Sequence, residues 1–408
     1  MTDGGAAFPL ALFLAVGETA RLPLAMLLVF GSAKLLAELF ERFDQPGIVG
    51  EIIAGILIGP SVLGWVSPNE TLSVLADLGV MFLLFRVGLE VKASELLRVG
   101  PTATLVAFLG VVAPFALGWG ILLLWGAPQI EAIFVGAAMV ATSVGITAQV
   151  LSAKGLLQHI SSQTILAAAV IDDVFGLLVL AMVSNVAKGN VNILELALTA
   201  VLAIGFTVVV AKWGTLVMGK LVPRAEQKLR AGEVQFNVAM VLLFVLALLA
   251  SWAGVAAIIG AFLAGMALAE STGRRVHDLA HGVTELLVPF FLVGIGLHLD
   301  LSAFATASTL ILALVILLAA IASKLVGCGL GAWRLGRADM WRIGFGMVPR
   351  GEVGMVVAQI GLAMGVISQP VYGVVVFMAV ATTLVAPPLV NLAFKDLPAA
   401  EAERFRLG

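Results

Sequence analysis

Runs of 18 or more apolar residues recur along this 408-residue chain and limit the folds open to it. Each run is long enough to cross a hydrocarbon layer about 30 Å thick as a helix. Hydrophobic residues make up 61% of the sequence and charged residues 12%, about half the charged fraction of a soluble domain. The strands of about ten alternating residues that a membrane β-barrel needs are absent from the sequence. We therefore predict an all-α protein that crosses a bilayer many times.

Thirteen segments have the length and composition of a membrane span. Their approximate limits are 21–40, 47–64, 71–91, 101–126, 130–153, 160–186, 192–222, 232–252, 254–270, 284–300, 306–335, 339–365 and 369–394. Residues 1–20 lack the basic region of a signal peptide, so we expect an extracytoplasmic segment there. We expect a cytoplasmic loop at Gly219–Glu233, which contains Pro223, to join a first half, 21–222, to a second half, 223–408.

Lysines and arginines are distributed unevenly between the two ends of these spans. With the N-terminus outside, only Arg21 and Lys188 fall on the outer side. The cytoplasmic side then carries Arg42, Lys92, Arg98, Lys154, Lys220, Arg224, Lys228, Arg230, Arg274, Arg275, Arg334, Arg337, Arg342, Lys395, Arg404 and Arg406. Because positive residues concentrate on the cytoplasmic side, we predict an outer N-terminus and a cytoplasmic C-terminus.

Three charged residues lie deep inside apolar spans, where each costs about 2.5–3.5 kcal/mol on insertion scales. Asp172 and Asp173 lie in span 160–186, and Lys324 lies in span 306–335. This pattern predicts an ion or proton pathway. Neighbouring residues of a helix point about 100° apart, so the two aspartates take different roles. We expect Lys324 to pair with one of the two carboxylates, the alternative being a purely structural ion pair.

Two spans contain an interruption at mid-depth. One is Ala141–Thr147 in span 130–153, and the other is Gly346–Gly354 in span 339–365. The second should break at Pro349, which lacks an N–H group and clashes with the preceding helical turn. The two spans run in opposite directions, and paired interrupted helices in inverted halves indicate the binding site of a transporter.

Polar residues in these interruptions are candidate ligands. The hydroxyls of Thr142 and Ser143 suit a hard cation such as Na⁺, although hydroxyls bonded to their own helix are the alternative. Arg350 and Glu352 are expected to neutralise the ends of the half-helices and not to bind ions. All these residues and the charged pair fall about equally far into their spans, which favours one site.

Other polar residues and motifs give weaker signals. Glu51, Arg86 and Glu90 lie toward the cytoplasmic half, where two roles stay open: lining an access funnel, or ordinary interface contacts. Cys328 is the single cysteine, so no intramolecular disulfide is possible. No nucleotide loop, metal-cluster spacing or nucleophile and base arrangement rises above chance, so we expect no enzyme, no cofactor and no nucleic acid partner.

Five sequence motifs carry a resemblance to a known family. They are QPGIVGEIIAGILIGPSVLG at 45–64, FLLFRVGLE at 82–90, ATSVGITAQVL at 141–151, AAVIDDVFGLL at 168–178 and GMVPRGEVGMVVA at 346–358. In this order they resemble the cation:proton antiporter-2 family of monovalent cation/proton antiporters. The resemblance implies inverted repeats, a core domain and a dimerisation domain, a homodimer, and alternating access by an elevator-like movement of the core.

The aspartate pair resembles that of the electrogenic bacterial sodium/proton antiporters. In those proteins the second aspartate binds the ion and the first pairs with a lysine, a place that Lys324 matches. The resemblance thus implies that Asp173 carries ion and proton and that Asp172 pairs with Lys324. Many potassium-efflux relatives carry Gln-Asp instead, so Asp172 favours Na⁺ or Li⁺, with K⁺/H⁺ antiport as the alternative. A gated channel and a sodium-coupled solute symporter are further alternatives, but the sequence has no carbonyl filter motif. Arg86 departs from the family pattern, which usually has an apolar residue there, so the resemblance gives it no role.

Overall fold

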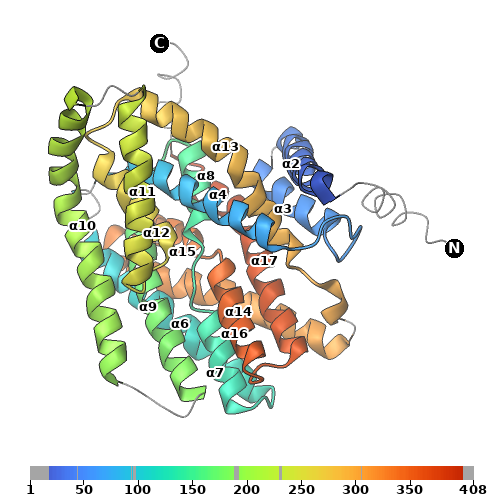
Figure 1. The fold of residues 1–408 in the computed structure, drawn as a ribbon. Coiled ribbons are helices and arrows are strands. Elements are labelled where there is room, and N and C mark those ends of the chain that lie inside the picture. The colour runs from blue at the N-terminus through green and yellow to red at the C-terminus, as the bar shows by residue number, and fades with distance from the viewer. Residues whose placement is uncertain are drawn as a thin grey trace.

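The computed structural model describes residues 18–43, 45–92, 94, 98–187, 193–228, 232–304 and 306–397, and within these ranges the protein is helical throughout its regular structure (Figure 1). Nine of the described helices are long and apolar enough to cross a membrane by length and composition. Shorter apolar helices lie at Gly47–Ile58, Gln129–Ala138, Val144–Ala153, Ala257–Leu268 and Gly354–Ala363. The expected all-α membrane architecture is therefore present, and each of the thirteen expected segments contains helix.

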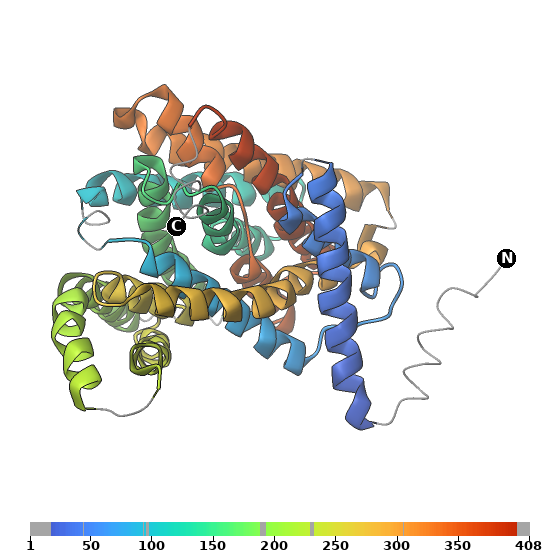
Figure 2. The same ribbon diagram turned by 90° about the horizontal axis from the view of Figure 1, so that it is seen from above.

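Seven helices pack mainly on one another and form a group that we call the panel. They are α2 (Glu18–Arg42), α3 (Gly47–Ile58), α4 (Glu70–Leu89), α10 (Ile193–Lys228), α11 (Val234–Trp252), α12 (Ala257–Leu268) and α13 (Arg274–Leu297). Helix α13 lies along α4 and α3, and α12 packs between α4 and α11. Figure 2 shows the row that results, from α10 and α11 at one end, along α13, to α2 at the other.

Pairs of glycines bring the panel helices together backbone to backbone. A Cβ on Gly88 would lie 2.2 Å from the carbonyl oxygen of Phe262, and one on Gly265 would lie 2.1 Å from that of Phe85. Gly55 and Gly296 make the same close approach between α3 and α13. Lipid gives helices no hydrophobic drive to associate, so close packing through small residues is a main source of their cohesion.

The other helices form a second group, which we call the bundle. It consists of α6 (Gly100–Leu124), α7 (Gln129–Ala138), α8 (Val144–Ala153), α9 (Ile160–Ala187), α14 (Ala307–Gly331), α15 (Arg337–Gly346), α16 (Glu352–Ala363) and α17 (Gln369–Ala393). Two short 3₁₀ helices, Leu301–Phe304 and Trp333–Leu335, flank α14. Helices α14, α7 and α9 all pack around α6, and the bundle meets the panel chiefly through α8, α9 and α17.

Both expected interruptions are present, and they touch. Helix α7 ends at Ala138 and α8 begins at Val144, while α15 ends at Gly346 and α16 begins at Glu352. We call the two non-helical stretches, 139–143 and 347–351, the crossing. There the backbone N–H of Ser143 donates to the carbonyl oxygen of Pro349 over 2.8 Å.

Glycine is required at one point of the crossing. A Cβ on Gly351 would lie 2.6 Å from Cβ and 2.7 Å from Oγ of Ser143. Distances under 3.0 Å are essentially never seen for real Cβ atoms. The two non-helical stretches of the crossing can approach this closely because Gly351 has no side chain.

Two helix boundaries differ from those expected. The expected loop at 219–233 is wrong over its first part, because α10 continues through Pro223 to Lys228. Helix α13 begins at Arg274, ten positions before the expected span, because the helix includes a polar stretch ahead of its apolar part. The expected break between the eighth and ninth spans is present, and Gly254 there adopts a positive φ of 78°, which suits glycine.

Candidate ion-exchange site

A buried ion pair lies between α9 and α14. The Nζ atom of Lys324 is 3.1 Å from Oδ1 and 3.2 Å from Oδ2 of Asp172. Asp172 is 1% exposed and Lys324 is fully buried. The pair that the sequence predicted is therefore formed, and neither charge has water as an alternative partner.

Two residues that sequence reasoning missed enclose this pair. A Cβ on Gly110 of α6 would lie 3.4 Å from Nζ of Lys324 and 2.7 Å from Sγ of Cys328. Cys328 is buried one turn beyond Lys324 on α14. Gly110 is one of 44 glycines, so only the packing of α6 against α14 distinguishes it from the others.

Asp173 occupies a different environment from its neighbour. It follows Asp172 on α9, so its side chain points about 100° further around the helix axis. It retains partial exposure, whereas Asp172 is buried. The two carboxylates thus face different surroundings, as the different roles proposed for them require.

Hydroxyl groups lie at the crossing. Thr142 and Ser143 are each 6% exposed, and Ser143 is the residue that precedes α8. Among the described residues, the buried Oγ1 of Thr142 has no hydrogen-bond partner. Buried hydroxyls are normally bonded, so an orphaned oxygen at this depth suits coordination of a hard cation.

The guanidinium of Arg350 joins the crossing to the helix of the ion pair. Its Nη1 donates to the carbonyl oxygens of Val140 (3.2 Å) and Ala141 (3.3 Å), just beyond the C-terminal end of α7. Its Nη2 donates to the carbonyl oxygen of Ala320 on α14 over 2.9 Å. Carbonyl groups at the end of a half-helix carry partial negative charge, which a cation offsets.

The backbone of Arg350 is fixed as well. Its N–H donates to Oγ1 of Thr382, and its carbonyl oxygen accepts from Oγ1 of Thr383, both on α17. The arginine thus links α7, α14 and α17. Glu352, expected to act beside it, begins α16, but its side chain lies outside the part of the structure that is described.

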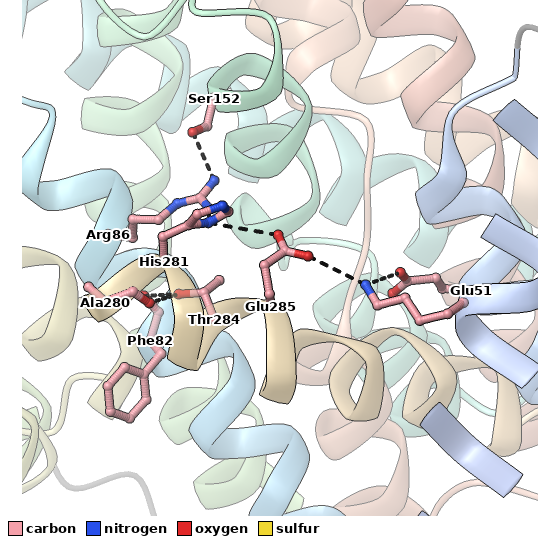
Figure 3. A network of polar contacts seen from close by, with 9 residues as sticks. Glu51, Phe82, Arg86, Ser152, Ala280, His281, Thr284 and Glu285 are labelled. Carbon is pink, nitrogen blue, oxygen red and sulfur yellow. Dashed lines mark hydrogen bonds and ion pairs between the residues drawn. The ribbon is translucent and has the colours of Figure 1, made fainter. Parts of the chain in front are cut away.

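Glu51 and Arg86, two of the three residues assigned to a funnel or to interface contacts, lie in one polar region (Figure 3). Nη1 of Arg86 lies 2.7 Å from Nδ1 of His281, and Nη2 donates to Oγ of Ser152 over 3.2 Å. Glu51 is 6% exposed and pairs with Lys34 over 3.2 Å. The structure therefore brings these residues together at the ends of α3 and α4.

Glu90 follows α4 in the same region. Burial raises the pKa of its carboxyl group, while the charge of Arg86 and a hydrogen bond with Ser152 act in the opposite direction. The side-chain amide of Gln158 donates to the backbone carbonyl oxygen of Glu90. Glu90 thus contacts both α8 and the segment between α8 and α9.

Comparison with known proteins agrees with this architecture. Residues 25–395 match the transmembrane family described as sodium/hydrogen exchanger. The chain belongs to this family. It is therefore an integral membrane transporter and not an enzyme, as the sequence predicted.

Two antiporters are similar in sequence to this chain over nearly their whole length. The chain is 34% identical to the "High-affinity Na(+)/H(+) antiporter NhaS3" of Synechocystis sp., over 93% of this chain and 91% of that protein. It is 34% identical to the "Na(+)/H(+)-K(+) antiporter GerN" of Bacillus cereus, over 90% of this chain and 95% of that protein.

The fold is that of a solved sodium proton antiporter. MjNhaP1 from Methanocaldococcus jannaschii matches with a TM-score of 0.67 at 18% identity, covering 96% of this chain and 99% of that one. A second structure of the same antiporter, from electron microscopy, matches with a TM-score of 0.71. At this identity the likeness concerns the fold alone.

Proposed function

We propose that this protein exchanges Na⁺ or Li⁺ for protons across the membrane, with Asp173 as the group that alternately holds cation and proton. The observation that carries the proposal is the buried Asp172 and Lys324 pair immediately beside Asp173. The paired aspartate motif, with the lysine as its partner, also supports the antiporter-2 assignment made from the sequence.

The exchange reaction follows from these groups. Protonated Asp173 releases its proton to one side, and the carboxylate then binds the cation, aided by the hydroxyl oxygens of Thr142 and Ser143. When the cation weakens the hold of Asp172 on Lys324, the lysine also releases a proton. Two protons then leave as one cation binds, and each cycle moves one net charge.

A second candidate is exchange of K⁺ for protons. It is favoured by the similarity to GerN, whose name includes both Na⁺ and K⁺. Hydroxyl and carboxylate oxygens bind either ion, so the size of the site decides between them. Comparing Na⁺, Li⁺ and K⁺ gradients across proteoliposomes that contain a pH-sensitive dye separates the two candidates.

Alternating access requires two parts that move relative to one another. The bundle holds the ion pair and the crossing, whereas the panel is an extended layer joined through paired glycines. We assign the bundle as the moving core and the panel as the dimerisation domain. Movement of the bundle along the panel would expose Asp173 first to one side and then to the other.

Asp173→Asn tests the central role of this residue. The variant keeps the shape of the side chain and removes its charge, so cation-dependent proton movement in proteoliposomes should vanish. Asp278→Asn, at an exposed position on α13, is the matched control and should exchange normally. Exchange by Asp173→Asn near the rate of the unmodified protein contradicts the proposal.

We further propose a homodimer in a bacterial inner membrane, with α2 and α11 at the contact, the N-terminus outside and the C-terminus cytoplasmic. Both helices expose large apolar side chains, including Leu35 (74%) and Val241 (64%). Leu35→Cys in a Cys328→Ala background should cross-link between subunits. Cross-linking of Val356→Cys on the broken helix α16, without that of Leu35→Cys, contradicts this contact.

A further inference from the structure

Arg86 reaches across the boundary between the panel and the bundle. It lies in the last turn of α4, a panel helix, and donates to Ser152 near the end of the bundle helix α8. The backbone carbonyl oxygen of Glu90, one turn beyond, accepts from the side-chain amide of Gln158 in the segment after α8. One end of α4 thus makes a cluster of polar contacts with one end of α8.

The panel holds Arg86 in position. An arginine can only donate hydrogen bonds, so Nδ1 of His281 must be the acceptor in their 2.7 Å contact, and it carries no proton there. Glu285 follows His281 by one turn on α13, and its carboxylate lies 3.5 Å from Nζ of Lys34. Lys34 in turn pairs with Glu51 over 3.2 Å. This chain of contacts ties α13, α2 and α3 to Arg86 (Figure 3).

The two sides of Arg86 differ in strength. On the panel side it bonds His281 of α13, a helix that Glu285 and Lys34 join to α2 and α3. On the bundle side Nη2 has the single hydroxyl of Ser152, at 3.2 Å and partly buried. A hydrogen bond of this kind has a modest net strength, so it can break and reform without unfolding either group of helices.

We propose that Arg86 is a positioning residue that latches the end of α8, and with it the bundle, to the panel in this conformation. The proposal rests on the proposed movement of the bundle along the panel, since that movement separates α8 from α4. Each transport cycle must then break the bond between Arg86 and Ser152 and form it again. The arginine that departs from the family motif thereby acquires a role in how readily the bundle leaves this position.

Hydrogen exchange of the purified protein in detergent tests the latch without any need for transport. Arg86→Leu should raise the amide exchange rate across residues 150–159, and Ser152→Ala should raise it similarly. The double variant should show no further increase, because both substitutions remove the same bond. Arg86→Lys keeps a donor and should restore part of the protection.

A matched control and a transport readout complete the test. Arg42→Leu removes an exposed arginine of the panel that pairs with Glu38 four residues earlier on α2, and it should leave residues 150–159 unchanged. In proteoliposomes Arg86→Leu should alter the maximal exchange rate by about two- to tenfold, the effect of one hydrogen bond. Each variant must also elute as a folded protein.

Two results overturn the proposal: unchanged amide exchange in Arg86→Leu, or fully additive effects in the double variant. If the protein fails to exchange any cation but the two substitutions remain coupled in hydrogen exchange, the proposed function fails and the latch stands. If it exchanges cations and the coupling is missing, only the latch fails.

Discussion

Lys324 places its Nζ almost equally far from the two carboxylate oxygens of Asp172, at 3.1 and 3.2 Å, in a site closed to solvent. Such a pair gains little stability over well-packed apolar residues, yet breaking it leaves a buried charge at a cost of about 3–5 kcal/mol. If Asp172 turns toward an incoming cation, the lysine is left unpaired and loses its proton. In the proposed function, cation binding is connected in this way to the release of a second proton.

Lys324→Gln separates this proton from the one carried by Asp173. The variant keeps a polar side chain but has no proton to release, so one proton should leave for each cation. Exchange should then become insensitive to a membrane potential imposed with valinomycin, while that of the unmodified protein responds to it. If the unmodified protein shows no response to the potential, Lys324 is only a structural partner of Asp172.

Gly110 controls how closely α6 approaches the ion pair. A Cβ there would meet Sγ of Cys328 at 2.7 Å and Nζ of Lys324 at 3.4 Å. Overpacking of this kind costs about 1–3 kcal/mol, so Gly110→Ala should lower the melting temperature in detergent and slow exchange. A Cβ on Gly120, on the same helix, would have no neighbouring atom within 4 Å, so Gly120→Ala should leave the melting temperature unchanged or raise it.

Cys328→Ala offers a specific rescue of this variant. Removing Sγ opens the space that the new methyl group needs, so the double variant should recover much of the lost stability. The two substitutions should therefore be strongly non-additive. Equal losses in Gly110→Ala with and without Cys328→Ala would show that the strain arises elsewhere.

The deep charges and the interrupted helices were predictable because each leaves a local mark on the sequence. A carboxylate is rare in an apolar membrane span. Pro349 removes a backbone N–H group within a span and so interrupts the helix. That Lys324 meets a carboxylate was predicted because membrane charges need partners, and the choice of Asp172 came from the family resemblance. The extension of α10 through Pro223 was not predicted, because the sequence placed this proline in a loop. In the structure α10 continues past it to Lys228.

Other contacts could not be predicted, because they join residues far apart with ordinary local sequences. Ser152 reads as a common helix residue, and nothing near it indicates a bond to Arg86. Arg350 was expected to neutralise a half-helix, but its contact with Ala320 on α14 depends on how three helices pack. Such relationships exist only once the panel and bundle have formed.

Arg350→Met should destabilise the crossing. The carbonyl oxygens of Val140 and Ala141 lose their donor, at about 1–3 kcal/mol for each buried group left unsatisfied, whereas that of Ala320 keeps the hydroxyl of Ser323. Thermal unfolding in detergent measures the loss, and Arg350→Lys should recover part of it because one charged donor remains.

Arg334→Met is the control for this variant. Arg334 is exposed and lies over the ring of Trp333 outside the crossing, so its loss should change stability by no more than about 0.5 kcal/mol. Equal destabilisation by the two methionine variants would mean that the contacts of Arg350 with the crossing carry no particular weight.

His159 gives the protein a pH-dependent stability. Burial lowers the pKa of its imidazole, Asp339 acts to raise it, and Arg342 acts to lower it further. As the pH falls below the ordinary value of about 6.5, the unfolded chain takes up a proton that folded His159 does not. The contribution of His159 to the free energy of unfolding is thus fully present above that pH and is lost as the pH falls toward the lowered pKa.

His159→Asn tests this dependence. Nδ1 of His159 accepts from the N–H of Ser161 over 3.2 Å, and the asparagine oxygen can accept without titrating. The variant should therefore lose less melting temperature than the unmodified protein between pH about 7.5 and about 5.5. His298→Asn, at an exposed position, is the control and should follow the unmodified protein. If the curves of all three proteins run parallel, the half-buried imidazole contributes nothing to the acid sensitivity of the fold.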